Sequence, residues 1–251
     1  MKRFCCLLFV LLAACTGSGL RTPDKQQRAQ ETARIQTQLA LEYMRIGDYR
    51  SAVQTAGEAV ANDAESQQAW LVRAQIYQAL AMEGEAEGSF RNALKLNPDS
   101  AEANNNYGWF LCSRKNLPQQ AVSYFDKALA DPTYPSPHVA YLNLGICSAK
   151  AGRYTAAEDS LARALRIAPD FVPAEKELIR VKLLSGNVQE AREMWQDYSR
   201  HGMRDAEDLW LGRQIAEASG DTGAVQEFEN RIRVGFPYSE EAKSLKQDSY
   251  K

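Results

Sequence analysis

The sequence predicts an all-α protein built as a stack of similar helical hairpins. The composition is rich in Ala, Gln, Glu and Leu, with few runs of Val, Ile and Thr, which favours helices over strands. From about residue 33 the chain repeats itself every 34 residues, so that Tyr43 recurs as Tyr77 and Ala52 recurs as Ala86. Later in the chain glycines keep the same period, at positions 152, 186 and 220. A fixed period of this length indicates a two-helix unit whose copies stack on one another.

Within each unit the order of residue types resembles the tetratricopeptide repeat (TPR). Small residues (Ala74, Gly108 and Gly145) fall on the first helix, where they allow the second helix to approach, and the large residues Phe90 and Phe125 fall on the second helix. The resemblance implies a right-handed superhelical solenoid of six TPR helix-turn-helix repeats. We expect the array to cover residues 31–251, with repeats at about 33–66, 67–100, 101–135, 138–171, 172–205 and 206–239. The polar residues 239–251 are expected to form a short frayed helix.

The repeat register slips between the third and fourth repeats. The step from Leu94 to Leu129 is 35 residues, and the step from Leu129 to Leu165 is 36. The extra residues lie in the segment 131–137, whose three prolines favour an extended connection. This segment is either a tolerated loop insertion or a functional hinge.

The N-terminus has the pattern of an export signal. Lys2 and Arg3 precede an apolar stretch, residues 4–14, that is too short to span a bilayer. Its end, Leu-Ala-Ala-Cys at 12–15, resembles a bacterial lipobox, which implies a lipoprotein signal peptide at residues 1–14 and a lipid anchor on Cys15. Residues 15–30 are expected to be the lipidated cysteine and a flexible tether. The alternative is an ordinary cleaved signal peptide, which would leave the exported body unanchored.

Several classes of function are disfavoured by the sequence. The formal net charge is −2 and there is no long basic run, which speaks against nucleic acid as a partner. The two histidines lie far apart, and there is no HExxH motif, phosphate-binding loop or nucleophile elbow. We therefore expect no catalytic residue, no metal, no cofactor and no small-molecule substrate.

Two cysteines remain in the body of the chain, Cys112 and Cys147. Both fall near the end of the first helix of consecutive repeats, and first helices of adjacent TPRs lie side by side, so a disulfide is geometrically plausible. An oxidising compartment favours the bond. The alternative is a pair of reduced, buried cysteines that act as small apolar residues.

The concave face of a TPR array, lined by first-helix positions, is where such proteins usually bind extended peptides. An apolar groove there with amide edges favours partner binding over solvation. For Trp109 and Ile146, packing in the core is an equal alternative. The positions that the family pattern assigns to this face are Thr37, Leu41, Leu71, Gln75, Gln78, Asn105, Trp109, Leu142 and Ile146.

A lipobox, a short tether, six TPRs and a cysteine pair in repeats 3 and 4 together resemble the type IV pilus biogenesis and stability lipoproteins, the pilotin-like PilW/PilF family. The resemblance implies an outer-membrane scaffold, held by the lipid on Cys15 with its body in the periplasm, that supports secretin assembly and pilus assembly. Thr16, which is not Asp, agrees with outer-membrane sorting in diderm bacteria. The alternatives are a TPR lipoprotein adaptor for cell-wall hydrolases or periplasmic proteases, and a subunit of a β-barrel assembly machine.

Overall fold

The computed structural model describes residues 24–200, 202 and 205–248, and this part of the chain contains thirteen α-helices and no strand. None of these helices is long and apolar enough to cross a bilayer. The elements are α1 (Lys25–Arg45), α2 (Tyr49–Asn62), α3 (Gln67–Ala79), α4 (Glu83–Leu96), α5 (Ala101–Ser113), α6 (Pro118–Leu129), α7 (Pro137–Lys150), α8 (Tyr154–Ile167), α9 (Val172–Leu184), α10 (Val188–Arg200), α11 (Ala206–Ala218), α12 (Thr222–Gly235) and α13 (Glu240–Asp248).

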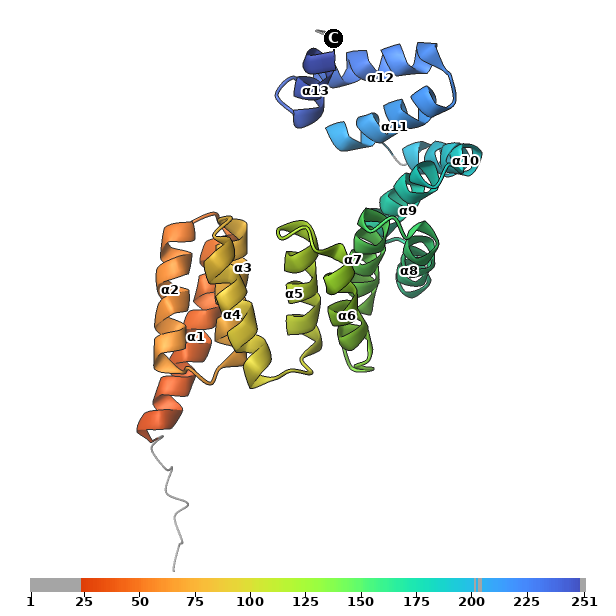
Figure 1. Cartoon of the computed structure of the whole chain (residues 1–251). Coiled ribbons are helices and arrows are strands. Elements are labelled where there is room, and N and C mark those ends of the chain that lie inside the picture. The colour runs from red at the N-terminus through yellow and green to blue at the C-terminus, as the bar shows by residue number, and fades with distance from the viewer. Residues whose placement is uncertain (1–23, 201, 203–204, 249–251) are drawn as a thin grey trace, which may run out of the picture.

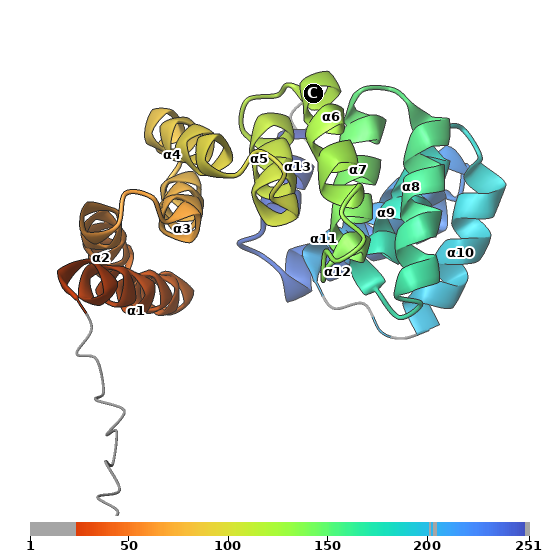
Figure 2. The same ribbon diagram turned by 90° about the horizontal axis from the view of Figure 1, so that it is seen from below.

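The first twelve helices form six antiparallel hairpins that stack along one axis, as the predicted TPR solenoid requires (Figure 1). The stack curves, so that α11 and α12 run across the direction of α1–α7 (Figure 1), and the view from below shows α11–α13 behind the earlier helices (Figure 2). Each first helix also contacts the first helix of the next repeat, as in the pairs α1–α3, α3–α5 and α5–α7. The first helices therefore line one face of the array continuously.

Each hairpin turn places one residue in the left-handed region of the backbone. Four turns use glycine there, with φ between 73° and 84°, whereas the second and third hairpins use Ala81 at φ 56° and Asn116 at φ 53°. Glycine adopts this conformation without a Cβ clash, and the non-glycine residues do so at some energetic cost.

Small residues on the first helices let the second helices approach closely. A Cβ built on Gly145 of α7 would lie 2.6 Å from Leu161 Cγ of α8, and one on Gly108 of α5 would lie 3.0 Å from Phe125 Cε1 of α6. Gly212 of α11 has the same role, because a Cβ there would lie 2.7 Å from Trp195. The side chain of the second helix thus fills the space that the small residue leaves.

The N-terminal boundary differs from the expected one. Residues 15–30 were predicted to be a tether, yet α1 begins at Lys25, so the last six residues of that segment are helical. The reason is local: Asp24 Oδ1 accepts from the Gln27 backbone N–H at 2.7 Å, and the Gln27 side chain accepts from the Asp24 N–H at 3.1 Å. This reciprocal capping box satisfies backbone donors and starts the helix early. The predicted signal peptide, residues 1–14, and Cys15 lie outside the described residues.

The C-terminal helix is packed against the array. Ala242 and Leu245 of α13 are buried against Leu209 of α11 and Ile232 of α12, so the expected short helix forms at 240–248, but it is packed and not frayed. Terminal repeats expose a hydrophobic face unless something covers it, and α13 covers the last hairpin.

The close approach at Gly145 gives a test of the packing. Gly145→Ala forces a Cβ into Leu161, an overpacking that costs about 1–3 kcal/mol and that exceeds the gain of up to about 1 kcal/mol from replacing a helical glycine. We expect a lower urea midpoint by circular dichroism. Gly88→Ala in α4, where a Cβ would meet nothing within 4 Å, is the matched control and should raise the midpoint. A raised midpoint for Gly145→Ala would contradict this packing.

Candidate protein-binding grooves

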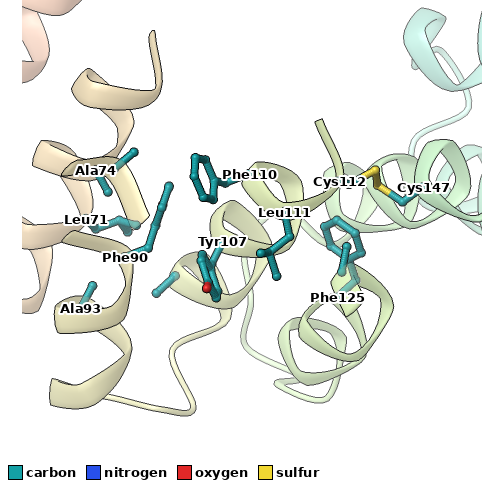
Figure 3. Packing of buried hydrophobic residues seen from close by; sticks show 13 residues of the cluster. Leu71, Ala74, Phe90, Ala93, Tyr107, Phe110, Leu111, Cys112, Phe125 and Cys147 are labelled. Carbon is teal, nitrogen blue, oxygen red and sulfur yellow. A yellow bond between two sulfur atoms is a disulfide. The ribbon is translucent and has the colours of Figure 1, made fainter. Parts of the chain in front are cut away.

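An aromatic cluster joins the second and third repeats and fixes the position of α5. Phe90 reaches from α4 toward α5, where its ring lies 5.6 Å from that of Tyr107 and 5.4 Å from that of Phe110 (Figure 3). Phe90, Phe110 and Phe125 are fully buried. Trp109, between Tyr107 and Phe110 in sequence, is half-buried against this cluster and also lines the open face, so both interpretations of Trp109 hold in part.

The first groove lies across the first helices of repeats 1 to 3, with a volume of about 560 Å³. Its walls come from α1, α3 and α5. Its lining combines apolar side chains and amides with one acidic residue, Glu102, and one basic residue, Arg114. Four of the predicted residues line it, and Met44, Gln68, Ala79 and Asn106 also do. The four are Leu41, Gln75, Gln78 and Trp109.

Three predicted binding residues do not belong to this surface. The side chains of Thr37, Leu71 and Asn105 are only 4%, 1% and 4% exposed. Thr37 Oγ1 donates to the Ala33 carbonyl at 2.7 Å, and Leu71 packs in the aromatic cluster. A partner cannot contact these side chains without unpacking the helices, so we correct their assignment from binding to packing.

Met44 is the apolar wall residue that the family pattern missed. It lies three residues after Leu41, which places both on one helix face. Applying this helical spacing to Leu41 points to Met44. In the structure both side chains are half-buried and line the same groove.

A second groove of about 330 Å³ continues the same face toward the C-terminus. The predicted residues Leu142 and Ile146 of α7 form its apolar wall, together with Val172 and Pro173. Ile146 is half-buried and lines the groove, so it is not a residue of the closed core.

The opposite wall of the second groove is an ionic network between α9 and α11. Lys176 Nζ lies 3.0 Å from Glu207 and 3.2 Å from Asp208, and the Tyr198 hydroxyl donates to Asp208 Oδ1 at 2.8 Å. Burial opposes the charge on Lys176, yet its hydrogen bonds with Glu207 and Asp208 raise the pKa of the ammonium group above its usual value. Burial, and then the bond to Asp208, raises the pKa of Tyr198 to about 12.

The two grooves therefore differ in charge. Lys176 is the one basic residue among the lining residues of the second groove, against four acidic ones (Glu177, Asp205, Glu207 and Asp208), whereas the charges of the first groove balance. The first groove suits a neutral extended segment that offers backbone hydrogen bonds, and the second suits a segment with apolar and basic side chains.

Two side-chain pairs hold α5 and α7 together at the joint where the repeat register slips. Cys112 and Cys147 form a disulfide with their Cα atoms 5.9 Å apart, visible at the end of α5 (Figure 3). Further along the same helices Asn143 Nδ2 donates to Asn105 Oδ1 at 3.0 Å. The joint between the two grooves is thus held by a covalent bond and a hydrogen bond, although the linker beside it is longer than in the other repeats.

The titratable residues of the described chain show no arrangement typical of a metal or acid–base site. No group of three or more His, Cys, Asp and Glu side chains in this part could hold a metal ion. His138 packs edge-on against Phe171, with ring centroids 4.9 Å apart. The charged side chains around the second groove instead form ion pairs between α9 and α11.

Comparison with known proteins agrees with this architecture. Tetratricopeptide repeat profiles match residues 37–80, 84–135 and 114–170, residues 148–211, and residues 67–100. The crystal structure of PilW, described as a widely conserved type IV pilus biogenesis factor, is 50% identical, covers 85% of this chain and 97% of its own, and superposes with a TM-score of 0.80. The type IV pilus assembly protein PilF of Pseudomonas aeruginosa is 25% identical over 234 residues, which are 93% of this chain and 92% of PilF. A PilF structure superposes with a TM-score of 0.73 at 23% identity.

The repeated hairpins and these profiles define the chain as a tetratricopeptide repeat protein. Within that class it belongs to the family of type IV pilus biogenesis TPR proteins that includes PilW and PilF. Members of this family are TPR scaffold or biogenesis factors.

The disulfide gives a prediction about stability. It closes a loop with a sequence separation of 35 residues, which in the chain-entropy model stabilises the fold by about 4 kcal/mol. We expect Cys112→Ser/Cys147→Ser to unfold at a lower urea concentration than the oxidised protein, and reductant to have no further effect on this variant. An oxidised protein whose midpoint is unchanged by reductant, with free thiols confirmed by mass spectrometry, would contradict the prediction.

Proposed function

We propose that this protein is an outer-membrane lipoprotein scaffold that supports assembly or stability of the type IV pilus secretin through its first groove. The observation that carries the proposal is that groove, because it presents Leu41, Met44 and Trp109 beside the amides of Gln75 and Gln78 on the face that the first helices share. Apolar anchors flanked by amide groups suit an extended peptide, whose side chains fill the pockets while its backbone bonds to the amides.

Family membership supports the pilus part of the proposal. PilW is described as a type IV pilus biogenesis factor and PilF as a type IV pilus assembly protein, and this chain matches both over most of its length. The choice of the secretin as the partner rests on the resemblance to pilotin-like lipoproteins. A TPR adaptor for cell-wall hydrolases has no comparable support from the sequence relatives.

The predicted lipid anchor is consistent with the proposed location. The lipobox at residues 12–15 would attach acyl chains to Cys15, nine residues before the N-cap residue Asp24. An extended chain of that length reaches roughly 30 Å. The first repeats, which form most of the first groove, would then lie close to the membrane in which a secretin ring assembles.

The groove is tested by removing its amides. We expect Gln75→Ala/Gln78→Ala to weaken partner binding about tenfold, because each lost hydrogen bond is worth about 0.5–1.5 kcal/mol. Introduced into a deletion strain, this variant should restore fewer secretin multimers and surface pili than the unmodified protein at equal abundance. Gln226→Ala/Gln247→Ala, which removes two exposed amides from α12 and α13, is the matched control and should restore both fully. Normal multimers and pili in the deletion strain itself would exclude the pilus function.

The location is tested at the lipobox. Cys15→Ser should abolish acyl-chain labelling and move the body from the membrane fraction to the soluble periplasmic fraction, because the acyl chains would supply its attachment to the membrane. Thr16→Asp should keep the lipid but shift the protein to the inner membrane. A Cys15→Ser variant that stays with the outer membrane in high salt would refute lipid anchoring as the cause of the location.

A further inference from the structure

The opposite side of α5 carries a cavity that none of the functions above uses. It has a volume of about 410 Å³ and lies between the second helices α4 and α6, over α5. Asn104, Tyr107 and Leu111 of α5 line it. Their i, i+3, i+7 spacing places them on one helix face, roughly opposite Asn106 and Trp109 of the first groove. The array therefore offers a second surface, made by different helices.

The rim of this cavity is basic. Arg91 and Lys95 come from α4 and Lys127 comes from α6, and no Asp or Glu is among the lining residues. Arg91 pairs with Glu87. Lys95 and Lys127 are both exposed, and neither forms an ion pair with any other part of the chain that the structure describes. Lys127 instead lies 5.6 Å from the ring centre of Tyr124. Two cations without a described ion-pair partner, one from α4 and one from α6, thus line the same cavity in a protein whose net charge is negative.

The floor of the cavity is apolar and aromatic. The rings of Tyr107 and Tyr124 meet edge-on with centroids 4.9 Å apart, and Leu94 and Leu111 complete the surface. This floor gives an apolar side chain a place to bury between the two basic rims.

One buried polar atom beneath the floor has no partner. Asn104 is fully buried, and its Nδ2 donates to the carbonyls of Pro98 and Ser100, each at 2.8 Å. These two bonds fix the orientation of the amide, so Oδ1 points away from them, and it lacks a hydrogen-bond donor. An unpaired buried acceptor is energetically unfavourable, but Asn104 is fully buried, so no group of a partner reaches it in this packing.

From these features we propose that the cavity between α4 and α6 binds an extended acidic peptide segment of a partner protein. The apolar side chains of the segment would lie on the tyrosines and leucines of the floor, and its carboxylates would pair with Lys95 and Lys127. The negative net charge of the chain opposes attachment to an anionic lipid surface, and a free phosphate has no apolar part to bury on the floor, so these features favour a peptide. This proposal does not rest on the pilus function.

The test uses the purified full-length mature chain and a labelled peptide of about eight residues that alternates Asp and Leu, spanning roughly 26 Å when extended. Fluorescence anisotropy should show binding that weakens as the salt concentration rises from about 0.05 M to about 0.5 M. Lys95→Gln/Lys127→Gln should raise the Kd about fivefold, as expected for the loss of two exposed ion pairs. Gln120→Lys, which adds a cation at the lining of the cavity, should lower the Kd about twofold.

The matched control removes two exposed cations elsewhere. Lys150 of α7 and Arg166 of α8 are exposed and line none of the grooves described above. The double variant Lys150→Gln/Arg166→Gln should therefore leave the Kd of the peptide unchanged. Equal weakening by both double variants, or equal binding of a peptide with Asn in place of Asp, would reduce the effect to general electrostatics and overturn the proposal. So would the absence of binding up to about 1 mM peptide. Binding of anionic phospholipid vesicles that depends on Lys95 and Lys127, without peptide binding, would assign the cavity to lipid headgroups and likewise overturn it.

Discussion

The structure depends on close packing between small residues on several first helices and large side chains of the neighbouring helices. A single hairpin has too little interior to bury both of its faces, so each repeat is stable only when the next one covers it. Phe125 against Gly108, and Leu161 against Gly145, set how close the helices lie. Where α4 and α5 are less closely packed, Phe90, Tyr107 and Phe110 occupy the space between them. Because each first helix also contacts the first helix of the next repeat, the first helices lie on one face and the second helices on the other.

That separation of helices produces the functional surfaces. Open grooves appear on the shared face of the first helices because their side chains have no further layer to pack against. The first groove ends at α5 and the second begins at α7, and the disulfide of Cys112 with Cys147 joins these two helices. The longer linker before α7 therefore does not free the two halves of the array at this joint, which favours a tolerated insertion over a hinge.

The sequence was sufficient for the fold because the repeat period and the small–large complementarity are encoded in the same residues. It was less informative about single positions. Leu71 and Asn105 occupy positions that point into the groove in the general repeat pattern, but here Leu71 meets the aromatic cluster and Asn105 bonds to Asn143. These contacts depend on which residue the next repeat presents, and a repeat pattern does not specify that. The start of α1 was missed for a different reason, since a single capping box decides it.

The C-terminal repeats illustrate how the same fold persists after its aromatic pattern weakens. Lys182 stands where an aromatic residue is usual, and its ammonium group lies 2.7 Å from Glu158 of the preceding repeat and 3.0 Å from Glu190 of its own hairpin. Lys176 and Arg180 make equivalent bridges to Glu207 of the following repeat. Ion pairs of this kind gain little free energy when exposed, but they are specific in position and partner. The partly buried network around Asp208 therefore keeps the last hairpins in register. It also makes the second groove acidic, so the residues that replace aromatic packing in this half of the array also determine which partners its surface can accept.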